Sequence, residues 1–206
     1  MKFGKKVLDL EIVVVSYKRV PQLRALVYSL LAQTNRNFSI HVIHDGGDSS
    51  TREAIREISI QNPELQLKYT ETDQRFNDYG HSLRDIGLQQ SKADYTLLTN
   101  DDNYYVPIFV QEMLNVAKDE KSDIVFCDMV HNHVFHDLPN PIGYQVLISQ
   151  PVLNRIDMGA FIFRTKIGQR IGFNSRAFEA DWDFFESMQV AGAHLSKIEK
   201  VLFVHN

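Results

Sequence analysis

The chain has 206 residues, of which 44% are hydrophobic and 23% are charged, and its formal net charge is -4 at pH 7. This composition is typical of a globular protein with one core, so we expect a single domain over residues 1–206. The negative charge argues against nucleic acid as a partner, and no apolar run approaches the roughly 20 residues that cross a bilayer.

Cysteine usage and the first residues indicate the compartment. Cys127 is the only cysteine, so no internal disulfide forms and a reducing setting is natural. The basic start, residues 1–6, resembles the beginning of a signal peptide, but Asp9 and Glu11 interrupt the apolar stretch that export requires. We therefore expect a cytoplasmic protein and leave peripheral attachment to a membrane open.

The first half of the chain alternates predicted strands and helices. The valine-rich run 10–16 is typical of a strand buried on both faces. Pro21 suits the first turn of a helix, and Ser50 with Glu53 has the spacing of a capping box. Short links between such elements predict a mostly parallel α/β sheet flanked by helices, as in nucleotide-binding folds. We predict strands at 10–16, 38–44, 65–70 and 95–99, and helices at 21–33, 50–59 and 80–90.

The second half is less regular. The segment 131–143 is dense in His, Pro, Asn and Gly, and we expect a loop that faces a ligand. It contains His131, His133 and His136, but no fourth ligand is near in the sequence, so a zinc site is not expected. We predict strands at 123–128, 159–164 and 201–205 and helices at 107–117 and 181–191, and we divide the domain into a nucleotide-binding half, about 8–107, and an acceptor and catalytic half, about 108–206.

The fourth predicted strand ends at the acidic segment Asn100-Asp101-Asp102-Asn103. Ligands collect at the carboxyl ends of strands in an α/β sheet, so paired acids there suggest a divalent cation, although a helix-capping turn has the same composition. The loop with Asp45 and Gly46 lies at the same edge. Asp45 either accepts a hydrogen bond from a base or ribose or caps the next helix, and Tyr17 is placed to stack on a base.

Several segments occur in an order that is informative as a set. They are VVVSYKR at 13–19, LLAQT at 30–34 with Asn37-Phe38, IHDGGD at 43–48, RDIG at 84–87, ADY at 93–95, and NDDN at 100–103 with Pro107. This ordered set resembles the family 2 glycosyltransferases of the GT-A fold. The likeness runs from about residue 11 to residue 107 and continues more loosely to the end of the chain.

The resemblance implies a single Rossmann-like GT-A domain and an inverting, metal-dependent glycosyltransferase of polysaccharide biosynthesis. Its donor would be a nucleoside diphosphate sugar with UDP as the nucleotide, and its acceptor a hydroxyl of a saccharide or of a lipid-linked molecule. The implied cofactor is a divalent cation, Mn²⁺ or Mg²⁺, which neutralises the leaving diphosphate. Asp102 and His205 fall at the metal-binding positions, whereas Asn100 stands where the family has an acid. The implied nucleotide-binding residues are Ser16, Tyr17, Arg19, Asp45, Gly46, Arg84 and Asp101, with Arg75 as a further cation for the diphosphate.

Sugar transfer to a hydroxyl also needs a carboxylate that accepts the hydroxyl proton. The resemblance places this base at Asp181, at the start of a late helix, with Glu179 and Asp183 as alternatives. Acids at a helix N-terminus are also favoured by the helix dipole alone. The residues implied to border the sugar are Gly159, Asp181 and Trp182.

Two other functions remain open from the sequence. A catalytically weakened homologue that binds nucleotide sugars is suggested by Asn100 and by Ala180, which replaces an acid of the family pattern. A sugar nucleotidyltransferase also places acids on a parallel sheet, but residues 16–21 lack the glycine-rich loop with which such enzymes open. The oligomeric state is left open, and association into a homo-oligomer is compatible with the sequence.

Overall fold

The computed structural model describes residues 8–132 and 143–206. The strands of this part are β1 (Leu10–Ser16), β2 (Phe38–His44), β3 (Leu67–Glu71), β4 (Tyr95–Asn100), β5 (Tyr104–Tyr105), β6 (Ile124–His131), β7 (Gln145–Leu147), β8 (Phe161–Arg164) and β9 (Leu195–His205). The helices are α1 (Val20–Leu31), α2 (Ser49–Gln61), α3 (His81–Gln90), α4 (Phe109–Asp119), α5 (Thr165–Ile171) and α6 (Ala180–Val190), with a 3-10 turn, η1 (Met158–Ala160).

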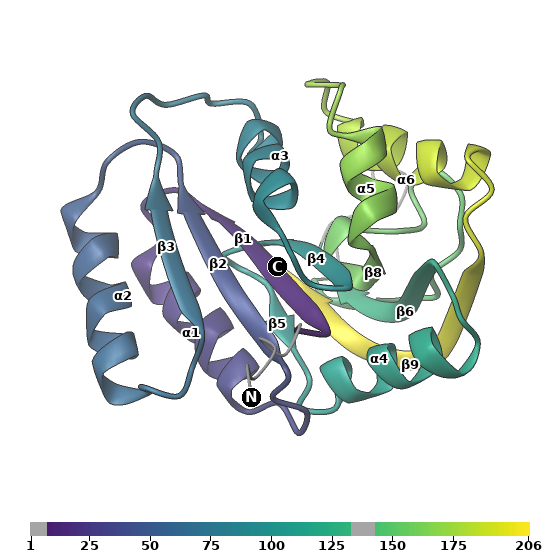
Figure 1. The fold of residues 1–206 in the computed structure, drawn as a ribbon, viewed down its shortest axis with the longest axis horizontal. Helices are drawn as coiled ribbons and strands as arrows, with labels where there is room; N and C mark the ends of the chain where they lie inside the picture. Colours follow the sequence, from purple (N-terminus) through teal and green to yellow (C-terminus); the bar gives the residue numbers. More distant parts are fainter. Residues whose placement is uncertain (1–7, 133–142) are drawn as a thin grey trace, which may run out of the picture.

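The described strands belong to one sheet in the order β3-β2-β1-β4-β8-β6-β9-β5, with β7 paired to β6 beside that path (Figure 1). Strands β1 to β4 are mutually parallel where they pair, β6 is parallel to β9, and β8 is antiparallel to both β4 and β6. Because β8 reverses direction between β4 and β6, strands β1, β2, β3, β4, β6 and β9 run the same way. Their carboxyl ends form one border of the sheet, here called the carboxyl edge, and the residues at these ends are Ser16, His44, Glu71, Asn100, His131 and His205.

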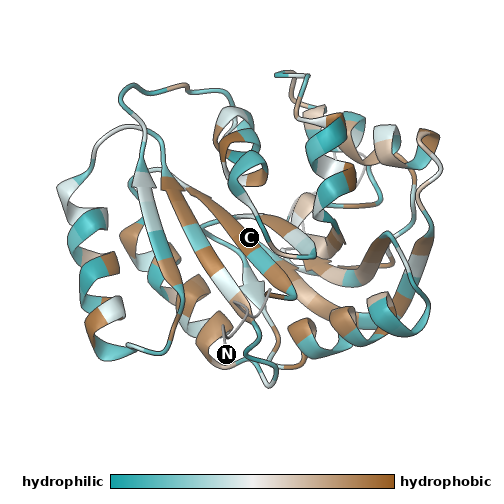
Figure 2. Ribbon diagram, in the orientation of Figure 1, coloured by the Kyte–Doolittle hydropathy of each residue, from teal (hydrophilic) through white to brown (hydrophobic). Residues whose placement is uncertain are grey.

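Helices cover both faces of the sheet. On one face α1, α2 and α4 bury residues such as Leu26, Ile58 and Met113 in a single apolar cluster with β1 and β2. On the other face α3 and α6 contribute Leu83 and Phe184 to a second cluster, against which α5 also packs. Figure 2 shows the strands of the centre as largely hydrophobic and the outer side of α2 as hydrophilic. The central strands are therefore buried on both faces, as the valine-rich run predicted.

The predicted alternation of strands and helices is confirmed, and β1 and β2 have the predicted bounds. The short elements β5, β7 and α5 were not predicted, and β9 begins at Leu195 rather than at residue 201. The prediction that Ser50 and Glu53 form a capping box is wrong. Asp48 caps α2 instead, because its Oδ2 accepts a hydrogen bond of 2.8 Å from the N–H of Thr51.

Two further sequence expectations concern the membrane and the histidine-rich segment. Within residues 8–132 and 143–206, no helix has the length and apolar character needed to cross a bilayer. His133 and His136 lie outside the described residues, as does most of the loop predicted at 131–143.

Candidate active site

The loops after β1 and β2 are joined by the buried His44. Its Nε2 accepts a hydrogen bond of 2.9 Å from the N–H of Lys18, and its Nδ1 lies 2.7 Å from the carbonyl oxygen of Gly46. Because a backbone N–H only donates, Nε2 is unprotonated and Nδ1 carries the proton. The neutral ring thereby stabilises two left-handed residues, Lys18 at φ 54° and Gly46 at φ 89°, at the carboxyl edge.

Tyr17 lies at the carboxyl edge between His44, at the end of β2, and Asp101, which follows β4. Its N–H donates to Oδ2 of Asp101 at 3.3 Å, and its ring is stacked on His44 with centroids 5.8 Å apart. The guanidinium carbon of Arg75 lies 3.9 Å from the centroid of the Tyr17 ring. The structure thus brings Tyr17, Asp101 and Arg75 together, and a nucleobase that stacked on Tyr17 would compete with Arg75 for the ring.

Asp45 is bound to the loop that follows β3. Its Oδ1 accepts a hydrogen bond of 2.7 Å from the N–H of Phe76, and its Oδ2 one of 3.0 Å from the N–H of Asn77. The side chain does not cap α2, because Asp48 does so. Asp45 therefore holds residues 72–80 at the carboxyl edge, and each of its oxygens retains a lone pair with which to accept a hydrogen bond from a ligand.

Asp101 and Asp102 both follow β4, but their surroundings differ. Asp101 is 3% exposed, and burial raises the pKa of its carboxyl to about 6, with Asp102 adding to the effect and Ser16 and Arg19 opposing it. The guanidinium of Arg19 binds Oδ2 of Asp102, and its Nη1 also lies 3.8 Å from Oδ1 of Asp101. The structure thus gathers four of the predicted nucleotide- and metal-binding residues, Ser16, Arg19, Asp101 and Asp102, in one place.

The carboxylate of Asp102 fits a cation. Its Oδ1 is buried and has no hydrogen-bond partner among the residues that the structure describes, while its Oδ2 contacts Arg19. A buried carboxylate oxygen without a donor is unfavourable, and a hard divalent cation would satisfy it. Asp102 therefore has an oxygen available to a cation, and its metal-binding role stays a prediction.

His205, the second predicted metal ligand, belongs to a neighbouring cluster. The ligand atoms of His131, Asp157 and His205 all lie within 4.8 Å of one another, and Nε2 of His205 is 3.5 Å from Oδ2 of Asp157. The rings of His131 and His205 are stacked with centroids 4.3 Å apart. Two imidazoles and a carboxylate suit a borderline cation such as Mn²⁺. The N–H of Asn206 lies 3.5 Å from Oδ1 of Asn103, so this cluster adjoins the acidic segment.

Arg84 is buried between three parts of the site. Its Nη2 donates to Oδ1 of Asn100 at 2.6 Å, its Nη1 donates to the carbonyl oxygen of Tyr79 at 2.9 Å, and the same Nη1 lies 3.8 Å from Oδ1 of Asp181. The residue is only 3% exposed, and both of its terminal nitrogens are engaged within the protein, while its Nε has no hydrogen-bond partner among the described residues. This environment favours a positioning role over direct contact with a diphosphate. The environment also gives the side chain of Asn100 a structural role, because its Oδ1 accepts a hydrogen bond from Arg84.

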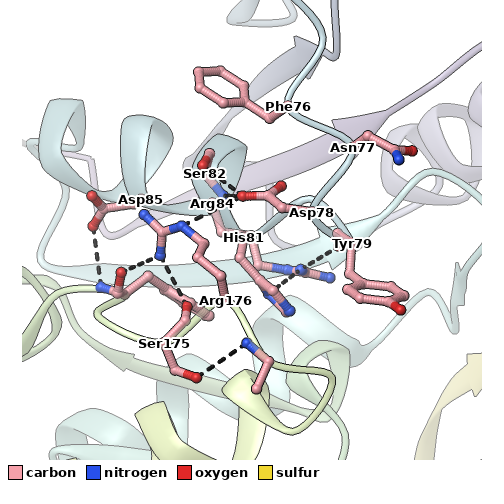
Figure 3. Close-up of polar contacts among 12 residues, drawn as sticks. Phe76, Asn77, Asp78, Tyr79, His81, Ser82, Arg84, Asp85, Ser175 and Arg176 are labelled. Carbon is pink, nitrogen blue, oxygen red and sulfur yellow. Dashed lines mark hydrogen bonds and ion pairs between the residues drawn. The ribbon is translucent and has the colours of Figure 1, made fainter.

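Asp181 is the one of the three candidate bases that contacts this network. It lies in the first turn of α6, and its Oδ1 is 3.6 Å from Nδ1 of His81, which also lies 3.2 Å from Nη1 of Arg84 (Figure 3 shows this second pair). Burial, and secondly Arg84, lower the pKa of His81, so its ring is neutral at pH 7. Glu179 is an exposed residue at the helix start, and Asp183 lines a shallow hollow formed with residues 172–175.

Gly159 and Trp182, predicted to border the sugar, are packed against the protein. A Cβ added at Gly159 would lie 2.5 Å from Cζ of Phe203 and 3.0 Å from the hydroxyl of Tyr105. Trp182 is half-buried against the second apolar cluster, with its ring 5.9 Å from that of Phe185. Glycine at position 159 is therefore required by packing, and the sugar contacts of both residues stay predictions.

Sequence reasoning assigned no role to His44, His81 or Asp157. A polar residue at the end of an apolar strand was the available signal for His44. His81 and Asp157 gave no signal, because their partners, Asp181 and His205, are distant in the sequence.

The family model described as Glycosyl transferase family 2 matches residues 11–170. An uncharacterized glycosyltransferase of Haemophilus influenzae is 29% identical over 186 residues, which are 85% of this chain and 60% of that protein. The uncharacterized glycosyltransferase YwdF of Bacillus subtilis is 28% identical over 123 residues, 59% of this chain and 42% of that protein. The chain thus spans 60% or less of the length of these curated relatives.

Solved structures show the same architecture. TarS of S. aureus, residues 1–349 in complex with UDP-GlcNAc, superposes with a TM-score of 0.76 at 17% identity, covering 96% of this chain and 58% of that one. The mannosyltransferase PcManGT of Pyrobaculum calidifontis, in complex with GDP-Man and Mn²⁺, gives a TM-score of 0.75 at 13% identity, covering 98% and 57%. At these identities the likeness concerns the fold, and the fold is GT-A.

Proposed function

The chain belongs to glycosyl transferase family 2, and from this premise we propose that it transfers a sugar from a nucleoside diphosphate sugar to an acceptor hydroxyl with inversion. The observation that carries the proposal is the placement of Arg84, which contacts Asn100 on the acidic segment and Asp181 on α6. One buried guanidinium thus links the acidic segment, where the donor would bind, to Asp181, the proposed base. The donor we propose is a UDP-sugar, and the acceptor is a saccharide, free or linked to a lipid.

Each end of the donor has residues suited to it. Tyr17 and Asp45 offer a ring and carboxylate oxygens for the nucleoside, and Gly46, at φ 89°, allows its backbone to approach closely. Arg19, beside Asp101 and Asp102, and Arg75, beside Asp45, are each about half exposed, so they supply the positive charge that a diphosphate requires.

Asp181 would accept the proton of the attacking hydroxyl. Its side chain is 35% exposed, so an acceptor reaches it, while Arg84 and the neutral His81 lie against Oδ1 from inside. Both contacts are longer than a hydrogen bond, so they place a charged and a polar group beside Oδ1 and leave Oδ2 for the hydroxyl. A base that takes the proton of the hydroxyl lets the acceptor oxygen displace the diphosphate in one step, and a single displacement inverts the anomeric carbon.

Asp102, through its Oδ1, which is unpartnered in the described part of the chain, and His205, which clusters with His131 and Asp157, would hold a divalent cation, Mn²⁺ for preference. When bound, the cation neutralises the charge of the leaving diphosphate. Arg19 binds the other oxygen of the Asp102 carboxylate, Oδ2, so its positive charge lies next to the position at which a cation would meet Oδ1.

Calorimetric titration with UDP, with and without Mn²⁺, tests the nucleotide part of the proposal. We expect binding that tightens in Mn²⁺, and no binding under either condition would refute the assignment. Transfer is tested separately by incubating the protein with UDP-sugars and a panel of saccharide acceptors. Retained UDP binding without transfer or donor hydrolysis would instead favour the weakened homologue that only binds nucleotide sugars.

A further inference from the structure

Two exposed aromatic side chains meet beside Asp181. The ring centroids of Tyr79 and Phe178 are 5.7 Å apart at an interplanar angle of 82°, and the residues are 68% and 74% exposed. Tyr79 precedes α3 and Phe178 precedes α6, so their contact joins two loops that are distant in the sequence. The ring of Tyr79 is 6.0 Å from that of His81, whose Nδ1 is 3.6 Å from Asp181. We call Tyr79 and Phe178 the aromatic rim.

The backbone holds Tyr79 in an unusual conformation. Its φ is 58°, in the left-handed region that bulky residues rarely adopt. The strained turn is fixed by Arg84, which donates to the Tyr79 carbonyl at 2.9 Å, and by Asp78, whose Oδ2 accepts from the N–H of Ser82 at 3.0 Å and lies 3.4 Å from Nε of Arg176. In Figure 3 the Tyr79 ring points away from the contacts of Asp78. Strain that places a large ring at the surface is typical of functional sites.

The charges near the aromatic rim select the class of ligand. Phe178 is followed by Glu179, Asp181 and Asp183, while Arg176 is paired with Asp78 and Arg84 is buried. Carboxylates accept hydrogen bonds from hydroxyls and repel phosphates. The rim therefore suits a neutral, polyhydroxylated molecule with an apolar face, which is the chemistry of a sugar ring. A phosphate-bearing ligand is better matched by the cations near Tyr17.

We propose that Tyr79 and Phe178 bind the sugar ring of the acceptor and present one of its hydroxyls to Asp181. The inference rests on the proposed function, in which Asp181 is the base. The C–H face of the ring packs on the aromatic side chains, and the flanking carboxylates accept hydrogen bonds from its other hydroxyls. Acceptor choice would then depend on the rim, whereas nucleotide binding would not.

Trp182 is the only tryptophan of the chain and adjoins Asp181, so its fluorescence reports binding there. We would titrate the protein, saturated with UDP and Mn²⁺, with glucose, galactose, mannose, N-acetylglucosamine, lactose and maltose. At least one saccharide should bind, and Tyr79→Ala and Phe178→Ala should each weaken it about tenfold. Tyr79→Phe, which keeps the ring, should bind as the unaltered protein does. Tyr28→Ala, which removes a 46% exposed tyrosine from α1, is the matched control and should change nothing.

Calorimetry with UDP on the same variants separates this inference from the proposed function. Both alanine variants should bind UDP within about twofold of the unaltered protein, because the Tyr79 ring contacts Phe178 and His81 rather than Tyr17 or Asp45. Saccharide binding that survives both substitutions overturns the inference, as does an unaltered protein that binds no member of the panel. If UDP does not bind the unaltered protein, the proposed function fails instead, and the saccharide titration without UDP still decides whether the rim binds sugars.

Discussion

Nη2 of Arg84 lies 2.6 Å from Oδ1 of Asn100, so an arginine of α3 is held by the residue at which this chain departs from the acidic pattern of its family. The amide of Asn100 accepts this hydrogen bond but, unlike a carboxylate, carries no negative charge. The positive charge of Arg84 is therefore not neutralised at position 100 and acts on Asp181, 3.8 Å away. The departure is thus compatible with an intact catalytic arrangement.

Arg84→Lys should disturb both stability and transfer. An ammonium keeps the charge but does not reach Asn100, the Tyr79 carbonyl and Asp181 together. We expect a loss of about 2 kcal/mol in the free energy of unfolding, measured in urea, and a lower kcat with UDP affinity retained. Arg52→Lys, at a 60% exposed side chain paired with Glu71, is the control and should cost less than about 0.5 kcal/mol. Equal effects of the two substitutions would contradict the positioning role of Arg84.

Asp181→Asn should lower kcat by about 10² to 10⁴ while UDP binding is retained, because an amide does not accept the hydroxyl proton. Glu179→Gln and Asp183→Asn, from the same turn, should each lower kcat by less than about tenfold, because each would weaken at most a hydrogen bond to the acceptor. Initial rates of sugar transfer check all three variants. A larger loss in Glu179→Gln or Asp183→Asn than in Asp181→Asn would move the base to that residue.

Asp101→Asn should stabilise the cation-free protein at neutral pH but not below about pH 4. The folded-state pKa of Asp101 is raised from 3.8 to about 6 by burial, so its favourable contribution is complete below pH 3.8 and is lost as the pH rises through about 6. The amide variant does not lose this contribution. Its advantage should grow between about pH 4 and pH 6 and reach up to about 3 kcal/mol at pH 7 in urea unfolding. A pH-independent difference would exclude the buried charge as its cause.

Arg19→Ala should increase the affinity for Mn²⁺ in the absence of nucleotide. The guanidinium binds the carboxylate of Asp102 and repels an incoming cation, but at 53% exposure it is well screened. We therefore expect a modest gain of up to about fivefold in calorimetric titrations with Mn²⁺. Asp102→Ala should abolish the gain. A weaker affinity in Arg19→Ala would mean that Asp102 is not the cation ligand.

Gly159→Ala should destabilise the fold by about 1–3 kcal/mol, because the added methyl would lie 2.5 Å from Cζ of Phe203. Removing the opposing ring with Phe203→Leu should make the same glycine substitution less costly, so the two changes together should cost less than the sum of each alone. Thermal or urea unfolding of the four proteins measures this coupling. Additive losses would leave the predicted sugar contact, rather than packing, as the reason for glycine.

The parallel half of the fold was readable from the sequence because β1 and β2 are apolar runs of the right length with turn residues after them. The missed elements depend on tertiary contacts. Tyr104 and Tyr105 form β5 only by pairing with β9, and α5 contains Gly168, whose absent Cβ allows Phe163 to pack closely. The sequence likewise located the acids of the site but not their partners. The contact of Arg84 with Asp181 joins residues of α3 and α6, and no local pattern specifies it.

The hydrogen bonds between Asp45 and the loop after β3 provide a way to follow nucleotide binding. The amides of Phe76 and Asn77 are protected by a carboxylate that is also expected to meet the nucleoside. A ligand that draws Asp45 away would release both amides, and one that adds to it would tighten them. The hydrogen-exchange rates of these two amides should therefore change when the donor binds, whether or not any sugar is transferred.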